Sequence, residues 1–169
     1  MQTESAYNGA AMRCTLVGVV LVVFALGCAT AKVDVIKAPP ERVGKVSLTF
    51  KPGPGAERMT EEQQSRLRST LTSALASSHV TVVSKSEAGV PALDGIIERY
   101  EPGNRALRYL VGFGAGKASF ASSWRLIEPS GVVVGECRVT GSMSIGGFGG
   151  SYDDVLDKVG AQLRGCLGS

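Results

Sequence analysis

Apolar and polar residues alternate most regularly between residues 133 and 145. Val133, Cys137, Val139, Met143 and Ile145 alternate there with Glu136, Arg138, Thr140, Ser142 and Ser144. This period of two is typical of a strand with one buried face and one polar face. The pattern predicts an antiparallel sheet that helices cover on one side.

Four other segments are predicted as strands from their β-branched and aromatic content: residues 43–50, 79–83, 92–100 and 117–127. The short segment 79–83 is expected to lie parallel to 43–50 through a right-handed crossover. The turn sequence from Glu128 to Gly131 is expected to reverse the chain before the last strand.

Two segments carry helical signals. Thr60 can cap the first helix while Gln63 reaches back to it, and this helix is expected to end near Ser78. Its apolar stripe is Leu67, Leu71, Ala74 and Leu75. The second helix is expected to begin at Ser151, with the acidic residues Asp153 and Asp154 in its first turn. Its apolar stripe is Val155, Val159, Leu163 and Leu167.

The element order β-α-β-β-β-β-α predicts an α+β fold. We expect a two-layer sandwich in which two helices lie on one face of a mixed, mostly antiparallel sheet of about five strands. Residues 43–169 should form this single domain, and the order of the strands is not predicted. Residues 28–42 contain Pro39 and Pro40 and are interpreted as a lipidated amino terminus and tether.

Residues 12–28, MRCTLVGVVLVVFALGC, have the layout of a bacterial lipoprotein signal peptide. A basic start precedes an apolar core that is too short to span a bilayer, and small residues precede Cys28. We expect translation to start at Met12, residues 1–27 to be removed, and Cys28 to carry diacylglycerol and a further acyl chain such as palmitate. Such a multiply acylated cysteine would be a stable membrane anchor.

An ordinary secretory signal in which Cys28 is incidental is the alternative. Because Ala29 rather than aspartate follows Cys28, sorting to the outer membrane is the expectation for a Gram-negative cell, with the domain facing the periplasm. Export that continued after loss of Met12 as a start codon would contradict the predicted start.

Composition narrows the class of partner. The formal charge is only +3 and the basic residues are scattered, so no nucleic-acid partner is expected. The chain contains 22 glycines, many of them in its second half, which points to tight loops and close backbone approaches.

Two cysteines remain after the predicted signal and anchor are set aside. Cys137 and Cys166 should lie at similar depths, on the last strand and the last helix, and the expected compartment is oxidising. A disulfide is one expectation, and two buried free thiols are the other.

Two glycine-rich segments are the candidate functional site. They lie before residue 117 and after residue 145, and the predicted strand directions bring both to one end of the sheet. The candidate interaction or ligand residues are Arg105, Arg108, Tyr109, Gly112, Phe113, Gly114, Gly116, Lys117, Gly147, Phe148 and Gly149.

Three functions are open for these segments. The glycines can allow another backbone or a lipid surface to approach closely, with Phe113, Phe148 and Tyr109 as apolar contacts. They can form an anion site with the nearby basic residues. Alternatively, both phenylalanines turn inward and cap the core. A P-loop and a dinucleotide fingerprint are excluded, because Val111, Ala118 and Lys117 occupy positions that those motifs reserve for other residues.

The segment GNRALRYLVGFGAGKASF, the WRLIEPSG hairpin and GSMSIGGFGGSYDD together resemble a family of small bacterial lipoproteins known only as a domain of unknown function (forty-four-ten). The resemblance covers most of the mature chain and implies an envelope lipoprotein domain, but it transfers no catalytic residue. The element order is also similar to that of envelope lipoprotein domains that assemble into rings around secretion pores, which is an analogy of fold.

Catalysis is not expected. The single histidine, His79, lies at a predicted helix end, where the carbonyl dipole favours it. Glu61, Glu62, Asp153 and Asp154 fall in first helical turns, where capping explains them. No metal-ligand spacing and no cofactor motif is present. We therefore expect an envelope component with a homo-oligomeric or protein partner, or else a periplasmic binding module for a small anionic or cell-wall ligand.

Overall fold

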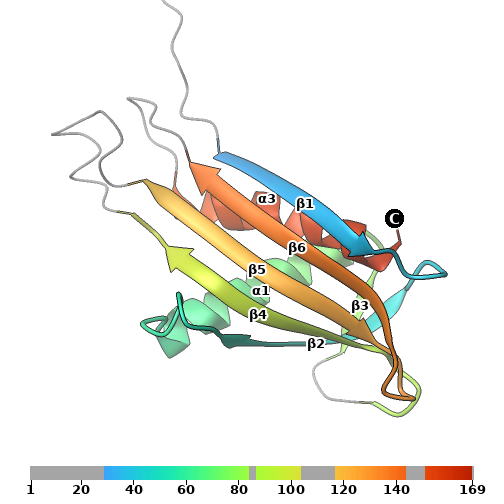
Figure 1. Ribbon diagram of the computed structural model, residues 1–169. Helices are drawn as coiled ribbons and strands as arrows, with labels where there is room; N and C mark the ends of the chain where they lie inside the picture. The colour runs from blue at the N-terminus through green and yellow to red at the C-terminus, as the bar shows by residue number, and fades with distance from the viewer. Residues whose placement is uncertain (1–28, 84–86, 104–116, 144–150, 169) are drawn as a thin grey trace, which may run out of the picture.

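A computed structural model describes residues 29–83, 87–103, 117–143 and 151–168. The chain forms β1 (Ala29–Lys37), β2 (Lys45–Pro52), α1 (Glu61–Ser77), β3 (Thr81–Val83), β4 (Ala92–Glu101), β5 (Ala118–Ile127), β6 (Val133–Met143), α3 (Tyr152–Leu163) and the short 3-10 helix η1 (Arg164–Leu167). The strands make one curved sheet, and both helices lie behind it on the same face (Figure 1).

The strand order in the six-stranded sheet is β1-β6-β5-β4-β2-β3. The pairs β1–β6, β6–β5 and β5–β4 are antiparallel, whereas β2 runs parallel to both β3 and β4. The prediction of an α+β two-layer sandwich with a mixed sheet is therefore confirmed, as is the parallel pairing of the short strand with the first predicted one.

The prediction that residues 28–42 form a tether is wrong for most of its length. Residues 29–37 form β1, which pairs with β6 from Ala29 opposite Met143 to Lys37 opposite Glu136. The stretch ATAKVDVIK does alternate, but two of its inward positions are alanines, which give a weak apolar signal. Only residues 38–44 connect β1 to β2 without helix or strand.

The core lies between the sheet and the two helices. Leu67, Leu71 and Leu75 of α1 are fully buried, and so is the predicted stripe of the last helix and η1 (Val155, Val159, Leu163 and Leu167). Both helices begin as predicted, because capping boxes link Thr60 with Gln63 and Ser151 with Asp154. Among the described residues, none of the helices is long and apolar enough to span a bilayer.

Glycines allow close packing at two points in the core. A Cβ on Gly95 of β4 would lie 2.4 Å from the ring of Trp124 on β5, so the indole packs directly over the β4 backbone. The buried indole N–H donates to Ser122 Oγ at 2.8 Å. A Cβ on Gly160 would lie 2.6 Å from Ala74 Cβ, which marks the contact between α3 and α1. The first contact lies within the sheet, and the second joins the two helices.

Candidate functional site

One end of the sheet collects the described residues that flank both glycine-rich segments. Ala29 and Ala118 both pair with Met143, and Ser119 pairs with Glu101 on the next strand. The amino terminus of α3 lies beside them, because the Tyr152 hydroxyl donates to the Ser119 carbonyl at 3.4 Å. We call this the loop end. It is defined by Ala29, residues 101–103, residues 117–119, Met143 and residues 151–153, and it lies at the upper left in Figure 1.

The opposite end of the sheet is called the turn end. It comprises residues 38–44, the turn at residues 128–131, and residues 164–168. Backbone hydrogen bonds connect its parts: Val43 N donates to Leu167 O at 3.1 Å, and Gly131 N donates to Glu128 O at 2.8 Å. The predicted turn between β5 and β6 is therefore confirmed.

Most of the predicted interaction residues lie outside the described residues. This is true of Cys28 and of Arg105, Arg108, Tyr109, Gly112, Phe113, Gly114, Gly116, Gly147, Phe148 and Gly149. Lys117 is described, and it is exposed immediately before β5. The residues on either side of both segments do lie at the same end of the sheet, as the strand directions predicted.

Two tyrosines meet at the loop end, where sequence reasoning assigned them no role. The rings of Tyr100 on β4 and Tyr152 on α3 pack edge to face with centroids 4.9 Å apart. Burial raises the pKa of both phenols above the ordinary value of 10.0, and for Tyr152 the neighbouring Tyr100 also raises it. The pair was not predictable, because it depends on where α3 crosses the end of β4.

An ion pair joins the two helices at the same end. Arg66 Nη2 of α1 lies 2.5 Å from Asp153 Oδ2 of α3, and both side chains are largely exposed. A cavity of about 670 Å³ adjoins this pair between α1, the end of β4 and the start of α3. At each helix start, an amide already has a side-chain acceptor: Thr60 Oγ1 accepts from Gln63 N, and Asp154 Oδ2 accepts from Ser151 N. This capping leaves the cavity poorly suited to an anion.

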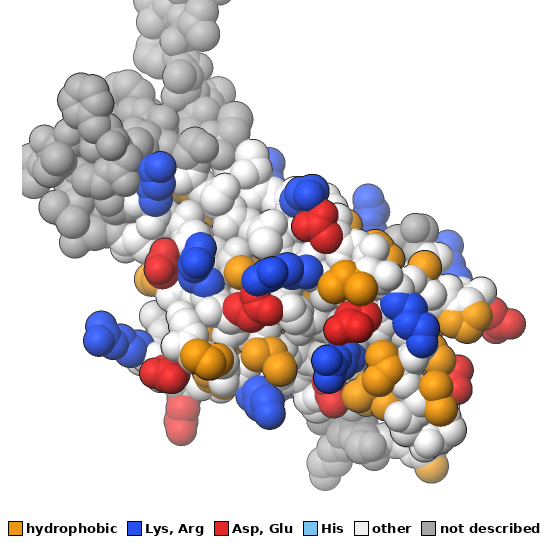
Figure 2. Space-filling model, in the orientation of Figure 1, with side chains coloured by type: hydrophobic (Ala, Val, Ile, Leu, Met, Phe, Trp, Pro, Cys, Tyr) orange, Lys and Arg blue, Asp and Glu red, His pale blue; other side chains and the backbone are white. Residues whose placement is uncertain are grey.

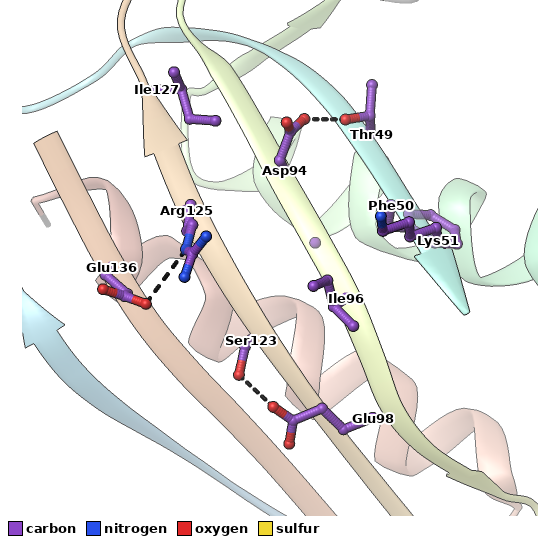
Figure 3. Close-up of a pocket in the computed structure, with 11 residues that line it drawn as sticks. Thr49, Phe50, Lys51, Asp94, Ile96, Glu98, Ser123, Arg125, Ile127 and Glu136 are labelled. Atoms are coloured by element: carbon purple, nitrogen blue, oxygen red, sulfur yellow. Dashed lines mark hydrogen bonds and ion pairs between the residues drawn. The ribbon is translucent and has the colours of Figure 1, made fainter. Parts of the chain in front are cut away.

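The face of the sheet away from the helices is polar. Figure 2 shows basic and acidic side chains interspersed over it, with apolar ones between them. A hollow of about 590 Å³ lies on this face above the backbone of Gly95. Thr49, Asp94, Ile96, Glu98, Ser123, Arg125 and Glu136 line it (Figure 3).

The carboxylates of this hollow hydrogen-bond or pair with neighbouring side chains. The Glu98 carboxylate accepts from Ser123 Oγ at 2.5 Å and forms an ion pair with Arg138. Arg125 Nε lies 3.4 Å from Glu136 Oε1, and Asp94 accepts a hydrogen bond from Thr49. The Glu98 and Glu136 carboxylates therefore already have arginine partners, and the Asp94 carboxylate already has a hydroxyl donor. Alternation indicated a polar face, but the sequence did not indicate which charges would pair.

Cys137 of β6 and Cys166 of η1 form a disulfide with their Cα atoms 5.5 Å apart. Both side chains are buried against the core. Of the two states that the sequence left open, the structure has the bonded one. The bond ties the chain terminus to the start of β6, next to the turn end.

His79 follows the end of α1 in a left-handed conformation with φ of 62°. Its N–H donates to Ala76 O at 3.0 Å, so the residue terminates the helix. Within the part of the chain that the structure describes, no group of three or more His, Cys, Asp or Glu side chains is arranged to hold a metal ion.

Residues 37–147 match the family model of the domain of unknown function DUF4410. The chain belongs to this family. The match begins at the last residue of β1 and stops before α3, so the edge strand and the second helix lie outside the matched range. The family resemblance found in the glycine-rich segments is therefore confirmed. Among curated proteins, no match is found.

Several solved structures are similar to this chain. The PelC dodecamer from Paraburkholderia phytofirmans is 17% identical with a TM-score of 0.50, and the alignment covers 83% of this chain and 98% of that chain. A DUF330 protein from Xanthomonas campestris is 12% identical with a TM-score of 0.49, over 76% of this chain and 87% of that one. A candidate lipoprotein from Caulobacter crescentus is 19% identical with a TM-score of 0.40, over 70% and 81% of the two chains. At 17% identity, the likeness to PelC concerns the fold alone.

Proposed function

We propose that this DUF4410 protein is a non-catalytic lipoprotein of the bacterial cell envelope. Cys28 carries its lipid anchor at the outer membrane, and the domain faces the periplasm. It acts as an assembly component that contacts copies of itself or another envelope protein at the loop end, through its glycine-rich segments.

The position of Cys28 directly before the folded domain carries this proposal. Every described strand and helix lies after Cys28, so cleavage before this residue would leave the sheet, both helices and the core intact. The sequence of residues 12–28 supplies the basic start, the short apolar core and the small residues that such cleavage needs.

The disulfide supports an oxidising compartment. Disulfides persist in the periplasm and outside cells and are rare in the cytosol. The bond between Cys137 and Cys166 is buried and joins two elements of the core, as a structural disulfide does.

The similarity of fold to PelC supports assembly. That protein forms a dodecamer, and the fold of this chain matches almost its whole length. The capping boxes at the starts of α1 and α3 disfavour the alternative of a small anionic ligand, since their side-chain acceptors already engage amides there.

The placement of the ionisable side chains supports a role without catalysis. His79 terminates α1, and Asp153 and Asp154 are engaged at the start of α3 by the ion pair with Arg66 and by capping. These contacts give each group a structural role.

Metabolic labelling with palmitate tests the anchor. The wild-type chain should incorporate label and fractionate with membranes, whereas Cys28→Ala should do neither. Cys14→Ala is the matched control and should still be labelled, because Cys14 lies in the predicted signal. Label that survives in Cys28→Ala would overturn the proposed anchor.

The native mass of the delipidated domain tests assembly. A discrete oligomer that crosslinks through loop-end positions supports the proposal. A monomer whose melting temperature rises with a cell-wall fragment or a small anion would instead favour a binding module.

A further inference from the structure

β1 leaves almost no slack between Cys28 and the sheet. Ala29 is the first residue of β1, is only 5% exposed, and pairs with Met143. Consecutive Cα atoms are about 3.8 Å apart, so a single peptide unit joins position 28 to the first residue of the sheet. A tether over residues 28–42 would instead have reached roughly 45 Å.

Contacts along β1 hold it firmly to the rest of the domain. It pairs with β6 without interruption from Ala29 to Val35. Thr30 Oγ1 donates to Ser142 O at 3.3 Å, and the inner side of the strand packs against α3 and η1. The first residue after Cys28 therefore moves with the sheet as a whole.

We infer that the loop end rests on the phospholipid headgroups of the membrane and that the turn end points into the aqueous compartment. This inference depends on the proposed lipidation of Cys28, because acyl chains on that residue hold the start of β1 at the bilayer surface. The residues in register with Ala29, or one strand further, come to the same level: Met143, Ala118 and Lys117.

The length of the sheet sets the distance between the turn end and the membrane surface. β5 has ten residues and runs from the loop end to the turn end, so it spans about 33 Å. Lys117 lies immediately before β5 and Ser130 lies in the turn after it, and both side chains are exposed. The inference therefore predicts that one of these positions is at the headgroups and the other is about 30 Å into the solvent. Copies that assemble at the loop end would meet at the membrane surface.

Fluorescence quenching by bromine-labelled lipid tests this orientation. Lys117→Cys and Ser130→Cys are each made in the full chain, purified from membranes, and labelled with nitrobenzoxadiazole. Each protein is then placed in vesicles of phosphatidylethanolamine and phosphatidylglycerol that contain brominated phosphatidylcholine. Quenching is expected to be several-fold stronger at position 117 than at position 130. Equal quenching at the two positions, or stronger quenching at position 130, would overturn the inference.

A second pair of cysteine variants controls for local effects of the first two substitutions. Glu101→Cys and Glu128→Cys replace the same residue type at the loop end and the turn end, and both positions are exposed. Quenching should again be stronger at position 101 than at position 128. Equal quenching at these two positions would likewise contradict the orientation. Palmitate content is measured on the same preparations. Unlabelled protein that stays off the vesicles would contradict the proposed anchor, whereas acylated protein with equal quenching would contradict the orientation alone.

Discussion

The two ends of the sheet are built differently. At the turn end the connections are short: residues 128–132 join β5 to β6, and residues 38–44 join β1 to β2. A backbone hydrogen bond from Val43 to Leu167 links residues 38–44 to η1, and hydrogen bonds within residues 128–132 close the turn. The disulfide between Cys137 and Cys166 also joins η1 to β6. At the loop end the chain runs through residues 102–117 between β4 and β5, and through residues 144–151 between β6 and α3.

Because of this difference, we expect the turn end to contribute mainly to stability and the loop end to carry the proposed interaction. Short connections and a covalent bond reduce the freedom of the unfolded chain, so the turn end contributes much of the domain's resistance to unfolding. Long connections presented by a rigid scaffold are where binding residues are commonly found. Beyond the strand pairing, the loop end includes an exposed ion pair and a tyrosine pair, which should contribute less than a disulfide.

Removal of the disulfide should have the largest effect on stability. The double variant Cys137→Ala, Cys166→Ala opens a loop between residues 29 positions apart, and it should lower the free energy of unfolding by about 3 to 4 kcal/mol. Denaturant titration of the delipidated domain measures this change. Membrane attachment of whatever protein remains folded should be unchanged, and a loss below 1 kcal/mol would contradict the importance given to this end.

The centre of the sheet should be the next most sensitive region. Gly95→Ala forces a methyl group into the ring of Trp124 and should lower the free energy of unfolding by about 1 to 3 kcal/mol. Gly44→Ala is the matched control, because a Cβ there meets nothing within 4 Å. Thermal unfolding of both variants measures the difference, and equal melting temperatures would show that the indole does not lie where the structure has it.

The ion pair between α1 and α3 should contribute less to the free energy of unfolding than the Gly95–Trp124 contact. Arg66→Ala removes the ion pair with Asp153, and because both side chains are exposed the loss should be about 0.2 to 1 kcal/mol. Denaturant titration at low salt and in 1 M salt measures it, and the difference from wild type should shrink in salt. A loss of stability that does not depend on salt and exceeds that of Gly95→Ala would contradict the expected ranking of the two regions.

The smallest effect should appear at alkaline pH. Because burial raises the pKa of Tyr152, the folded state holds this proton more tightly than the unfolded state does. The associated stability is fully present below the unfolded pKa of 10.0 and declines as the pH rises above it. Tyr152→Phe should therefore lose less stability than wild type when the pH is raised past 10.0. Parallel curves of melting temperature against pH for the two proteins would contradict the burial of this phenol.

Local patterns were sufficient to predict much of the fold. The capping sequence at Thr60 and the apolar stripes of both helices act within a few residues of the chain, so they could be recognised without the structure. β1 was missed because Ala29 and Ala31 are weakly apolar, and they become core residues only where α3 covers them.

Long-range features of the candidate site were not predictable. The contacts of Tyr100 with Tyr152 and of Gly95 with Trp124 depend on strand order, which no local pattern encodes. The state of Cys137 and Cys166 remained open for the same reason, since equal depth in two elements does not determine whether the two thiols meet. The finding that residues 29–37 form β1 and not a tether matters most for the functional interpretation. It leaves no flexible segment between the proposed anchor and the sheet.

The central claim is that this short connection orients the domain, and a flexible insert tests it most directly. In the test chain, ten Gly and Ser residues are inserted between Cys28 and Ala29. In the control chain, the same insert lies between Pro40 and Glu41, two exposed residues of the turn end, and it should leave the quenching difference in place. Each chain carries the label at position 117 or at position 130. In the test chain, the difference in lipid quenching between positions 117 and 130 should collapse while palmitate labelling and membrane attachment persist. A difference that remains as large as in the chain without an insert would contradict the claim.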